Sequence, residues 1–266
     1  MIEKIKSKPV IFSIILTFLL TILWIAATLL MQGFGQPGSL TLLIISASVN
    51  ITLAVLATVL MGMINGINGL KYAFKTKGLK KGLKALIPTV PFVLFGLIIS
   101  MSSAINTDNV NIAGIPLMAI FAAASAFMQT ALFRGLLATA LFVRLSGTER
   151  ERIRSAFSAS ALFLIMYVLI HIFSGNHIEA MQLVNTFVMG AAFCAAYLYS
   201  RNLMCLILLQ GIWQFLSFLI GLFIVESPDT VSPLALIPLA AILILMIGFA
   251  VRSCKRAEPF RLSLED

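Results

Sequence analysis

Long apolar runs separated by short polar segments dominate this chain. Eight of the runs have a length near the roughly 20 residues that a helix needs to cross a bilayer. They extend over Val10 to Met31, Leu40 to Asn65, Ala85 to Ile105, Ile115 to Arg144, Ser155 to Phe173, Met181 to Tyr199, Leu203 to Val225 and Pro233 to Val251. The pattern predicts an all-α, polytopic membrane bundle of about eight transmembrane helices.

Composition supports a membrane protein of one domain. Of the 266 residues, 60% are hydrophobic and only 11% are charged, which is far from the composition of soluble proteins. The first run follows Lys4, Lys6 and Lys8, as in a secretory signal peptide, but it is much longer than the signal core of about 7–15 residues. We therefore expect a retained first helix and a single membrane domain over residues 1–266.

The positions of the basic residues predict the orientation. Of the 19 Lys and Arg residues, all but Arg134 fall on one side of the eight-helix topology. By the positive-inside rule this side is cytoplasmic, and so are both termini. An anionic cytoplasmic leaflet then accounts for the net charge of +9, and no nucleic-acid partner is needed. The basic segments are the N-terminus, residues 71–84, Arg144 with Arg150, Arg152 and Arg154, Arg201, and Arg252 with Lys255, Arg256 and Arg261.

The second cytoplasmic segment, from Gly69 to Lys84, alternates six Lys residues with Leu and Phe. Such a segment is either an amphipathic helix on an anionic membrane surface or a solvated loop that fixes the topology. Gly78 and Gly82 weaken the helical interpretation.

Arg134 is the exception to the charge pattern, and other polar residues accompany it inside the predicted spans. Thr130 and Arg134 share a helix face, with Gln129 at its edge. Tyr167 and His171 share a face of the fifth span in the same way. Ionisable groups at membrane depth are costly and are functional candidates by default.

The seventh span adds Gln210 and Gln214, again four residues apart with Trp213 beside them. Gln129, His171 and Gln214 lie at similar depths, about 20 to 24 Å from the cytoplasmic ends at a rise of 1.5 Å per residue. We therefore expect these three helices to present polar groups to one cavity. The alternative is that the Gln and Thr residues only hold helices together by hydrogen bonds.

The segments Gln129-Thr-Ala-Leu-Phe-Arg-Gly135, Tyr167-Val-Leu-Ile-His171 and Gln210-Gly-Ile-Trp-Gln214 resemble three ordered motifs of a known family. This is the CAAX prenyl endoprotease and bacteriocin-processing family (CPBP, or Abi) of intramembrane proteases, whose patterns are Glu-Glu-x-x-x-Arg, Phe-x-x-x-His and His-x-x-x-Asn. The resemblance covers a core of about residues 115–218. It implies an intramembrane endopeptidase fold and a bacterial cell membrane.

The chain departs from the family at most motif positions. The paired glutamates correspond to Gln129 and Thr130, the aromatic residue to Tyr167, the second histidine to Gln210 and the asparagine to Gln214. The remaining two, Arg134 and His171, are unchanged. The resemblance therefore implies a vestigial site at these seven positions.

The residue chemistry argues against catalysis. No Asp or Glu occurs in the eight spans, and an amide cannot take a proton from water at neutral pH. His177 and Glu179 are nearby, but we predict that they lie in a loop after the fifth span. Cys194, Cys205 and Cys254 form no CxxC pair, so we expect no disulfide framework, no metal site and no cofactor.

These observations leave three hypotheses open. The first is a non-catalytic pseudoprotease that binds or scaffolds another membrane or cell-envelope protein. The second is an active intramembrane endopeptidase with a divergent site, in which His171 is the base and Gln129, Arg134 and Gln210 stabilise the oxyanion. The third is bacteriocin self-immunity, which needs no catalysis if the protein sequesters a receptor or peptide.

Overall fold

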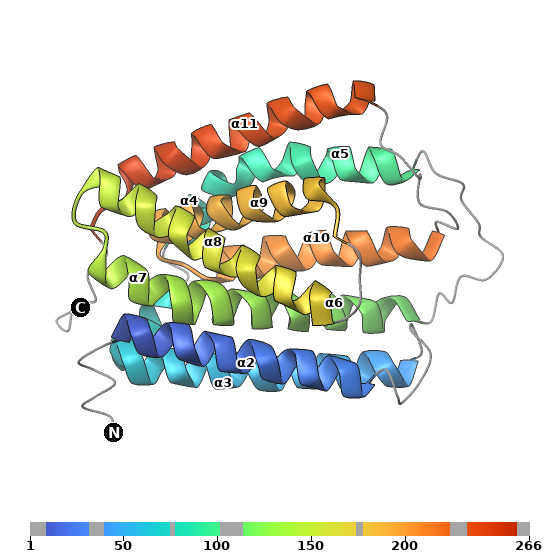
Figure 1. The fold of residues 1–266 in the computed structure, drawn as a ribbon, viewed down its shortest axis with the longest axis horizontal. Coiled ribbons are helices and arrows are strands. Elements are labelled where there is room, and N and C mark those ends of the chain that lie inside the picture. The colour runs from blue at the N-terminus through green and yellow to red at the C-terminus, as the bar shows by residue number, and fades with distance from the viewer. Residues whose placement is uncertain are drawn as a thin grey trace.

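A computed structural model describes residues 9–31, 40–74, 78–101, 114–173, 178–223 and 233–259, and these residues form a helical bundle without strands (Figure 1). The helices are α2 (Pro9–Met31), α3 (Leu40–Phe74), α4 (Leu79–Leu86), α5 (Val90–Met101), α6 (Ile115–Gln129), α7 (Thr139–Arg144), α8 (Glu149–Phe173), α9 (Ala180–Ser200), α10 (Met204–Phe223) and α11 (Pro233–Arg256). A 3₁₀ turn, η1 (Ile87–Thr89), joins α4 to α5, and a π-helix, η3 (Thr130–Ala138), joins α6 to α7.

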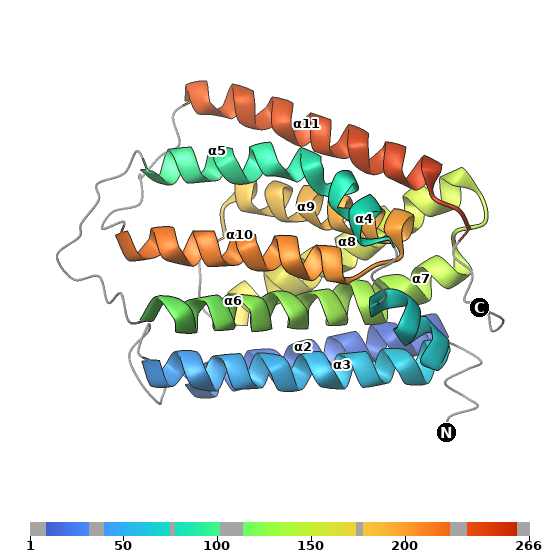
Figure 2. The ribbon, with the colours of Figure 1, turned by 180° about the vertical axis from the view of Figure 1, so that it is seen from behind.

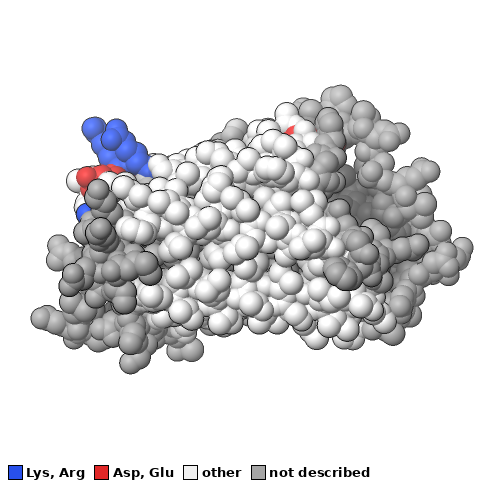
Figure 3. Space-filling view, turned by 60° about the horizontal axis from the view of Figure 1, so that its bottom comes forward, with Lys and Arg blue, Asp and Glu red and all other residues white. Residues whose placement is uncertain are grey.

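The helices confirm the predicted all-α membrane bundle, and the chain is a multi-pass membrane protein. Within the described residues six helical stretches are long and apolar enough to cross a membrane, and α10 contains a shorter apolar stretch, Met204–Leu219. A broad uncharged flank separates the two ends of the molecule (Figure 3). Lys4, Lys6 and Lys8 and the loops around Gln36, Asp108, Asn176 and Asp229 lie outside the described residues.

The bundle is built around α9. Helices α2 and α3 form one side and α11 the opposite side, with α9 between them in both views (Figures 1 and 2). Small side chains let neighbouring helices approach α9 closely, because Ala191, Ala195 and Ala196 are almost fully buried. The Ser160 hydroxyl also donates to the Phe187 carbonyl over 2.6 Å, which ties α8 to α9.

The third span differs from the prediction of one helix from Ala85 to Ile105. Ala85 belongs to α4, the chain turns through η1, and α5 begins at Val90. Pro88 and Pro91 explain the break, because proline has no N–H to continue a preceding helix and fits the first turn of a new one. Residues 102–105 lie outside the described part.

The fifth span begins earlier than predicted. Helix α8 starts at Glu149 rather than Ser155 because Thr148 and Glu151 form a reciprocal capping box. The Thr148 N–H donates to the Glu151 carboxylate over 2.9 Å, and the Glu151 N–H donates to the Thr148 hydroxyl over 3.2 Å. This pair satisfies two N–H groups that the first turn would otherwise leave unbonded.

The basic segment after the second span is helical in two pieces. Helix α3 continues to Phe74, and α4 begins after Gly78, whose φ of 95° places it in the left-handed region that glycine adopts readily. Gly82 is buried against the Cys205 side chain, where a larger residue would collide. Lys80 and Lys84 are exposed on α4, so its basic face is directed away from the bundle.

Arg152, which the sequence suggested only as a topology marker, is buried at the end of the bundle. Its guanidinium donates to the carbonyls of Cys254 over 2.9 Å and Lys255 over 3.5 Å, at the end of α11. It also donates to the carbonyls of Ser146 and Gly147, both over 3.3 Å. A single planar cation therefore satisfies the last carbonyls of α11 and holds them to the α7–α8 loop.

We expect Arg152→Lys to destabilise the protein, because a lysine cannot present the planar fork of donors that reaches all four carbonyls. Lost hydrogen bonds to a charged group correspond to about 1.5–3 kcal/mol. The measurement is thermal unfolding in detergent micelles. Arg154→Lys, at an exposed position on the same turn of α8, is the matched control and should leave the midpoint unchanged. Equal midpoints for both variants would contradict the capping role.

Candidate functional site

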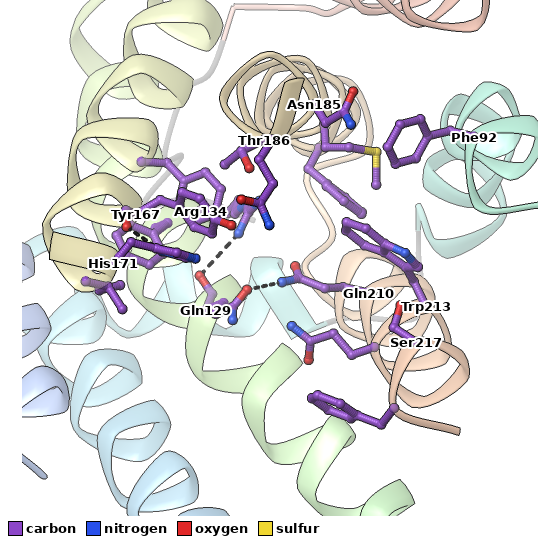
Figure 4. A pocket seen from close by; sticks show the side chains of 18 of the residues that line it. Phe92, Gln129, Arg134, Tyr167, His171, Asn185, Thr186, Gln210, Trp213 and Ser217 are labelled. Atoms are coloured by element: carbon purple, nitrogen blue, oxygen red, sulfur yellow. Dashed lines mark hydrogen bonds between the residues drawn. The ribbon is translucent and has the colours of Figure 1, made fainter. Parts of the chain in front are cut away.

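The predicted polar residues converge on one cavity inside the bundle. The cavity has a volume of about 390 Å³, within the range of small-molecule and peptide sites. Helices α2, α5, α6, α8, α9 and α10 and the π-helix η3 all contribute to its wall. The lining includes six of the seven predicted site residues, which are Gln129, Arg134, Tyr167, His171, Gln210 and Gln214 (Figure 4).

Thr130 is the seventh residue, and it lies behind the wall rather than in it. It is fully buried, and its hydroxyl donates to the Gln210 side-chain carbonyl over 3.3 Å. The Gln210 amide in turn donates to the Gln129 side-chain carbonyl (Figure 4). Gln129 of α6 and Thr130 of η3 are thus both hydrogen-bonded to Gln210 of α10.

The π-helix explains why Gln129 and Arg134 both face the cavity. The sequence predicted a regular α-helix, in which Thr130 and Arg134 share a face. In the structure the turn after Gln129 is wider, as hydrogen bonds between residues five apart require. The Arg134 guanidinium therefore reaches back to the Gln129 backbone carbonyl, 3.5 Å away, and Thr130 turns toward α10.

A hydrogen-bonded relay stabilises the wide turn from behind. The Thr139 hydroxyl donates to the Arg134 carbonyl over 3.2 Å, and the Tyr197 hydroxyl, 2.8 Å away, can donate to Thr139 in return. Both side chains are buried. The Arg134 carbonyl already accepts the Thr139 backbone N–H across the wide turn, so the relay adds a second hydrogen bond to the same oxygen. It fixes Arg134 from its backbone side.

Aromatic rings surround the Arg134 guanidinium. The residue is 2% exposed, and the guanidinium carbon lies 4.7 Å from the ring centre of Phe163 and 5.3 Å from that of Phe193. Cation–π attraction compensates for part of the lost hydration. The described residues offer Arg134 no carboxylate as an ion-pair partner. The cavity therefore contains a positive charge that no described side chain neutralises.

His171 lies on α8, the helix that also carries Phe163, and contacts within the helix orient its ring. Its Nδ1 lies 3.0 Å from the Tyr167 carbonyl, and its ring lies 4.1 Å from that of Tyr167, centre to centre. A carbonyl only accepts, so Nδ1 is the donor in this pair, and Nε2 is the ring nitrogen left for other contacts. Figure 4 shows the ring directed into the cavity toward Gln129.

Sequence reasoning missed the polar face of α9 that completes the cavity. Gln182, Asn185 and Thr186 line it from this helix. Their spacing of three and four residues within an apolar run was the available signal, because it places them on one helix face. The side-chain oxygens of Asn185 and Gln214 are buried and have no hydrogen-bond partner.

Described ionisable residues outside the cavity do not supply a metal site. No group of three His, Cys, Asp or Glu side chains that could hold a metal ion occurs among the described residues. Glu179 is exposed just before α9, and His177 lies outside the described part. Cys194, Cys205 and Cys254 are buried as free thiols.

Comparison with known proteins supports a relationship to CAAX-type proteases. The family model described as type II CAAX prenyl endopeptidase Rce1-like matches residues 111–216, a stretch that contains all three motif segments. This match confirms the relationship to the CPBP family that the motifs suggested. No curated protein and no solved structure matches the chain.

The hydrogen bond between Gln129 and Gln210 should be measurable as a coupling between α6 and α10. In a double-mutant cycle with Gln129→Ala and Gln210→Ala, we expect a coupling of about 0.6–1.7 kcal/mol in the free energy of unfolding, typical of interhelical hydrogen bonds in membranes. Reversible unfolding in mixed micelles provides the measurement. Gln129→Ala with Gln214→Ala is the control cycle, because the Gln214 oxygen has no partner. An equal coupling in both cycles would contradict the pairing.

Proposed function

We propose, from the relationship to CAAX-type proteases, that this chain is a pseudoprotease that binds another membrane or cell-envelope protein in the cavity without cutting it. The observation that carries the proposal is the pairing of Gln129 with Gln210. At these positions the family patterns have an acid and a histidine, whereas here two neutral amides satisfy each other. Their role in this chain is to hold α6 against α10.

Peptide hydrolysis by activated water needs a general base and stabilisation of the oxyanion. An amide oxygen accepts a hydrogen bond from water but does not take its proton. Within the described lining, His171 is the one side chain that can act as a base near neutral pH. The cavity therefore retains donors that stabilise a bound group, but it has lost the acid–base pair.

A hydrolytic metal centre does not fit these residues either. Catalytic zinc normally has three protein ligands from His, Cys or carboxylate side chains. His171 is the sole such side chain in the described lining. The amides, hydroxyls and guanidinium around it are poor substitutes, so no step of the proposed function involves a metal.

The features that favour binding lie on the side of the cavity formed by α9 and α10, which we call the amide side. Asn185 and Gln214 supply two buried side-chain oxygens without partners, and Trp213 and Ser217 lie nearby in the wall (Figure 4). Buried acceptors gain most from a ligand that donates N–H groups. A non-helical peptide segment has such groups free, which supports a protein as the partner.

The proposed setting is the cell membrane of a bacterium, with one membrane domain and both termini cytoplasmic. The described Lys residues of α4, the Arg residues of the α7–α8 loop and those at the end of α11 gather at one end of the bundle. The positive-inside rule assigns this end to the cytoplasm. The same end would contact the anionic cytoplasmic leaflet.

Site-specific photo-crosslinking in native membranes tests the binding function. With a photoreactive residue at Ser217, on the amide side, we expect a discrete protein adduct. The adduct should fall roughly fivefold or more when Asn185→Ala removes a hydrogen bond from the buried site. Ile244 on α11, which is 69% exposed, is the control position and should give no such adduct.

Two outcomes would contradict the proposal. One is the same set of adducts from Ser217 and Ile244, which would show only random collisions in the bilayer. The other is an adduct at Ser217 whose yield is unchanged in Asn185→Ala and in Gln214→Ala, because a partner seated in the cavity must contact these amides.

The geometry of His171 favours one alternative function, an active endopeptidase with a divergent site. The free Nε2 faces the cavity, and it would accept a proton from water while Gln129, Arg134 and Gln210 stabilise the oxyanion. If this alternative holds, purified protein in proteoliposomes cleaves a peptide library, and His171→Ala lowers the rate by roughly 10²–10⁴-fold. Cleavage that persists in His171→Ala eliminates it.

A further inference from the structure

The bundle has a second hollow beside the cavity, an apolar groove of about 350 Å³ between α2 and α8. Unlike the cavity, it has almost no polar lining. Several of its side chains, including Ile22 and Phe173, are largely exposed on the flank that faces lipid. The groove is formed by Phe18, Ile22, Ile25 and Leu29 of α2 and by Leu169 and Phe173 of α8.

The same two helices separate the groove from the cavity. Trp24 and Ile170 line the cavity, whereas their chain neighbours Ile25 and Leu169 line the groove. The partition is therefore one layer of side chains at the contact of α2 with α8. A ligand that occupies both spaces must displace these side chains.

The charge in the cavity lies against α8, one of the two helices that form this partition. Arg134 packs against Phe163 of α8, and Tyr167 and His171 lie one and two turns further along the same helix. A cation without a counter-ion in a low-dielectric interior favours any anion that can reach it. One guanidinium is balanced by one negative charge, and its fork of donors matches a carboxylate.

We propose that the groove and the Arg134 side of the cavity together bind a single-chain, monoanionic amphiphile such as a fatty acid. Its hydrocarbon chain lies in the groove between α2 and α8, and its carboxylate passes between Trp24 and Ile170 to Arg134. The amide side of the cavity stays free, so this site is independent of the proposed protein partner. Nothing in the cavity reacts with the ligand.

The affinity must come mainly from the head group. Lipid tails surround the chain equally well outside the groove, so transfer of the chain into the groove gains little free energy. The groove selects ligands by the shape of their hydrocarbon chain, and the ion pair with Arg134 contributes most of the binding free energy. An amphiphile of the same length without charge should therefore bind poorly.

The chain contains two tryptophans, Trp24 and Trp213, and both line the cavity. This allows a fluorescence test with 9,10-dibromostearate, whose bromines quench tryptophan on contact. The protein is studied in phosphatidylcholine nanodiscs as Trp213→Phe, which leaves Trp24 as the reporter and preserves a ring against Phe92. Trp24→Phe leaves Trp213, on the amide side, as the distant reporter.

We expect saturable quenching of Trp24 by the acid and at least about tenfold weaker binding of its methyl ester, because the ester cannot form the charged hydrogen bonds. Trp213 should be quenched much less. Ala26→Phe, which fills the groove, should abolish the saturable component. Ala241→Phe, at an exposed position on α11, is the matched control and should leave it intact.

Both Arg134 variants are compared with the wild type only if they unfold at the wild-type temperature. Arg134→Lys should then retain part of the difference in affinity between acid and ester, and Arg134→Gln should remove this difference. If these variants fail to fold, the comparison of acid with ester binding to protein that retains Arg134 still tests the proposal. Equal quenching by acid and ester, or saturable quenching that survives Ala26→Phe, would overturn the proposal. Both outcomes leave the crosslinking test of the protein partner unaffected.

Discussion

A hydrocarbon environment supplies no water, so each buried polar group of this protein must find its partner within the bundle. The Gln129–Gln210–Thr130 network meets this requirement at the centre of the fold. It fixes the separation of α6 and α10, and these two helices form a large part of the cavity wall. Gln129 and Gln210 both line the cavity, so its shape at this wall depends on the separation.

The same requirement is met differently at other places in the bundle. At the end of the bundle where α8 begins, the Arg152 guanidinium donates to four carbonyls. In the cavity Arg134 has one long hydrogen bond and two aromatic rings, and the oxygens of Asn185 and Gln214 have none. Ser13, Thr17 and Asn50 also have side-chain oxygens without partners, but in the cavity such groups lie beside a cation and open space, which is the physical basis for a binding site.

Much of the fold follows from the length of the apolar runs. Helices α2, α9 and α11 begin and end close to their predicted bounds, because a run of apolar residues must be helical to cross a bilayer. Breaks within such runs are harder to predict from the sequence. Pro88 and Pro91 were present in the sequence as a signal for the break before α5, and Thr148 with Glu151 as a signal for the start of α8.

Polar residues at helical spacing predicted which residues form the candidate site. They did not predict which way each side chain faces. The π-helix after Gln129 is stabilised by Thr139 at its end and, through Thr139, by Tyr197, which is 58 residues further along the chain, so local spacing gave no indication of it. Helical spacing also gave Thr130 the same role as Arg134, whereas Thr130 contacts α10 behind the wall. Hydrogen-bond partners on other helices decide which way such side chains face. A single sequence does not show these partners.

We propose that the cavity binds but does not cut, since Gln129 and Gln210 correspond, by the resemblance of the motifs, to an acid and a histidine. The most direct measurement compares peptide-library cleavage by the wild-type protein with cleavage by the variant Gln129→Glu, Thr130→Glu, Gln210→His, Gln214→Asn, both reconstituted in liposomes. We expect no cleavage by the wild type and measurable cleavage by the restored variant. Cleavage by the wild type that is lost in His171→Ala would contradict it.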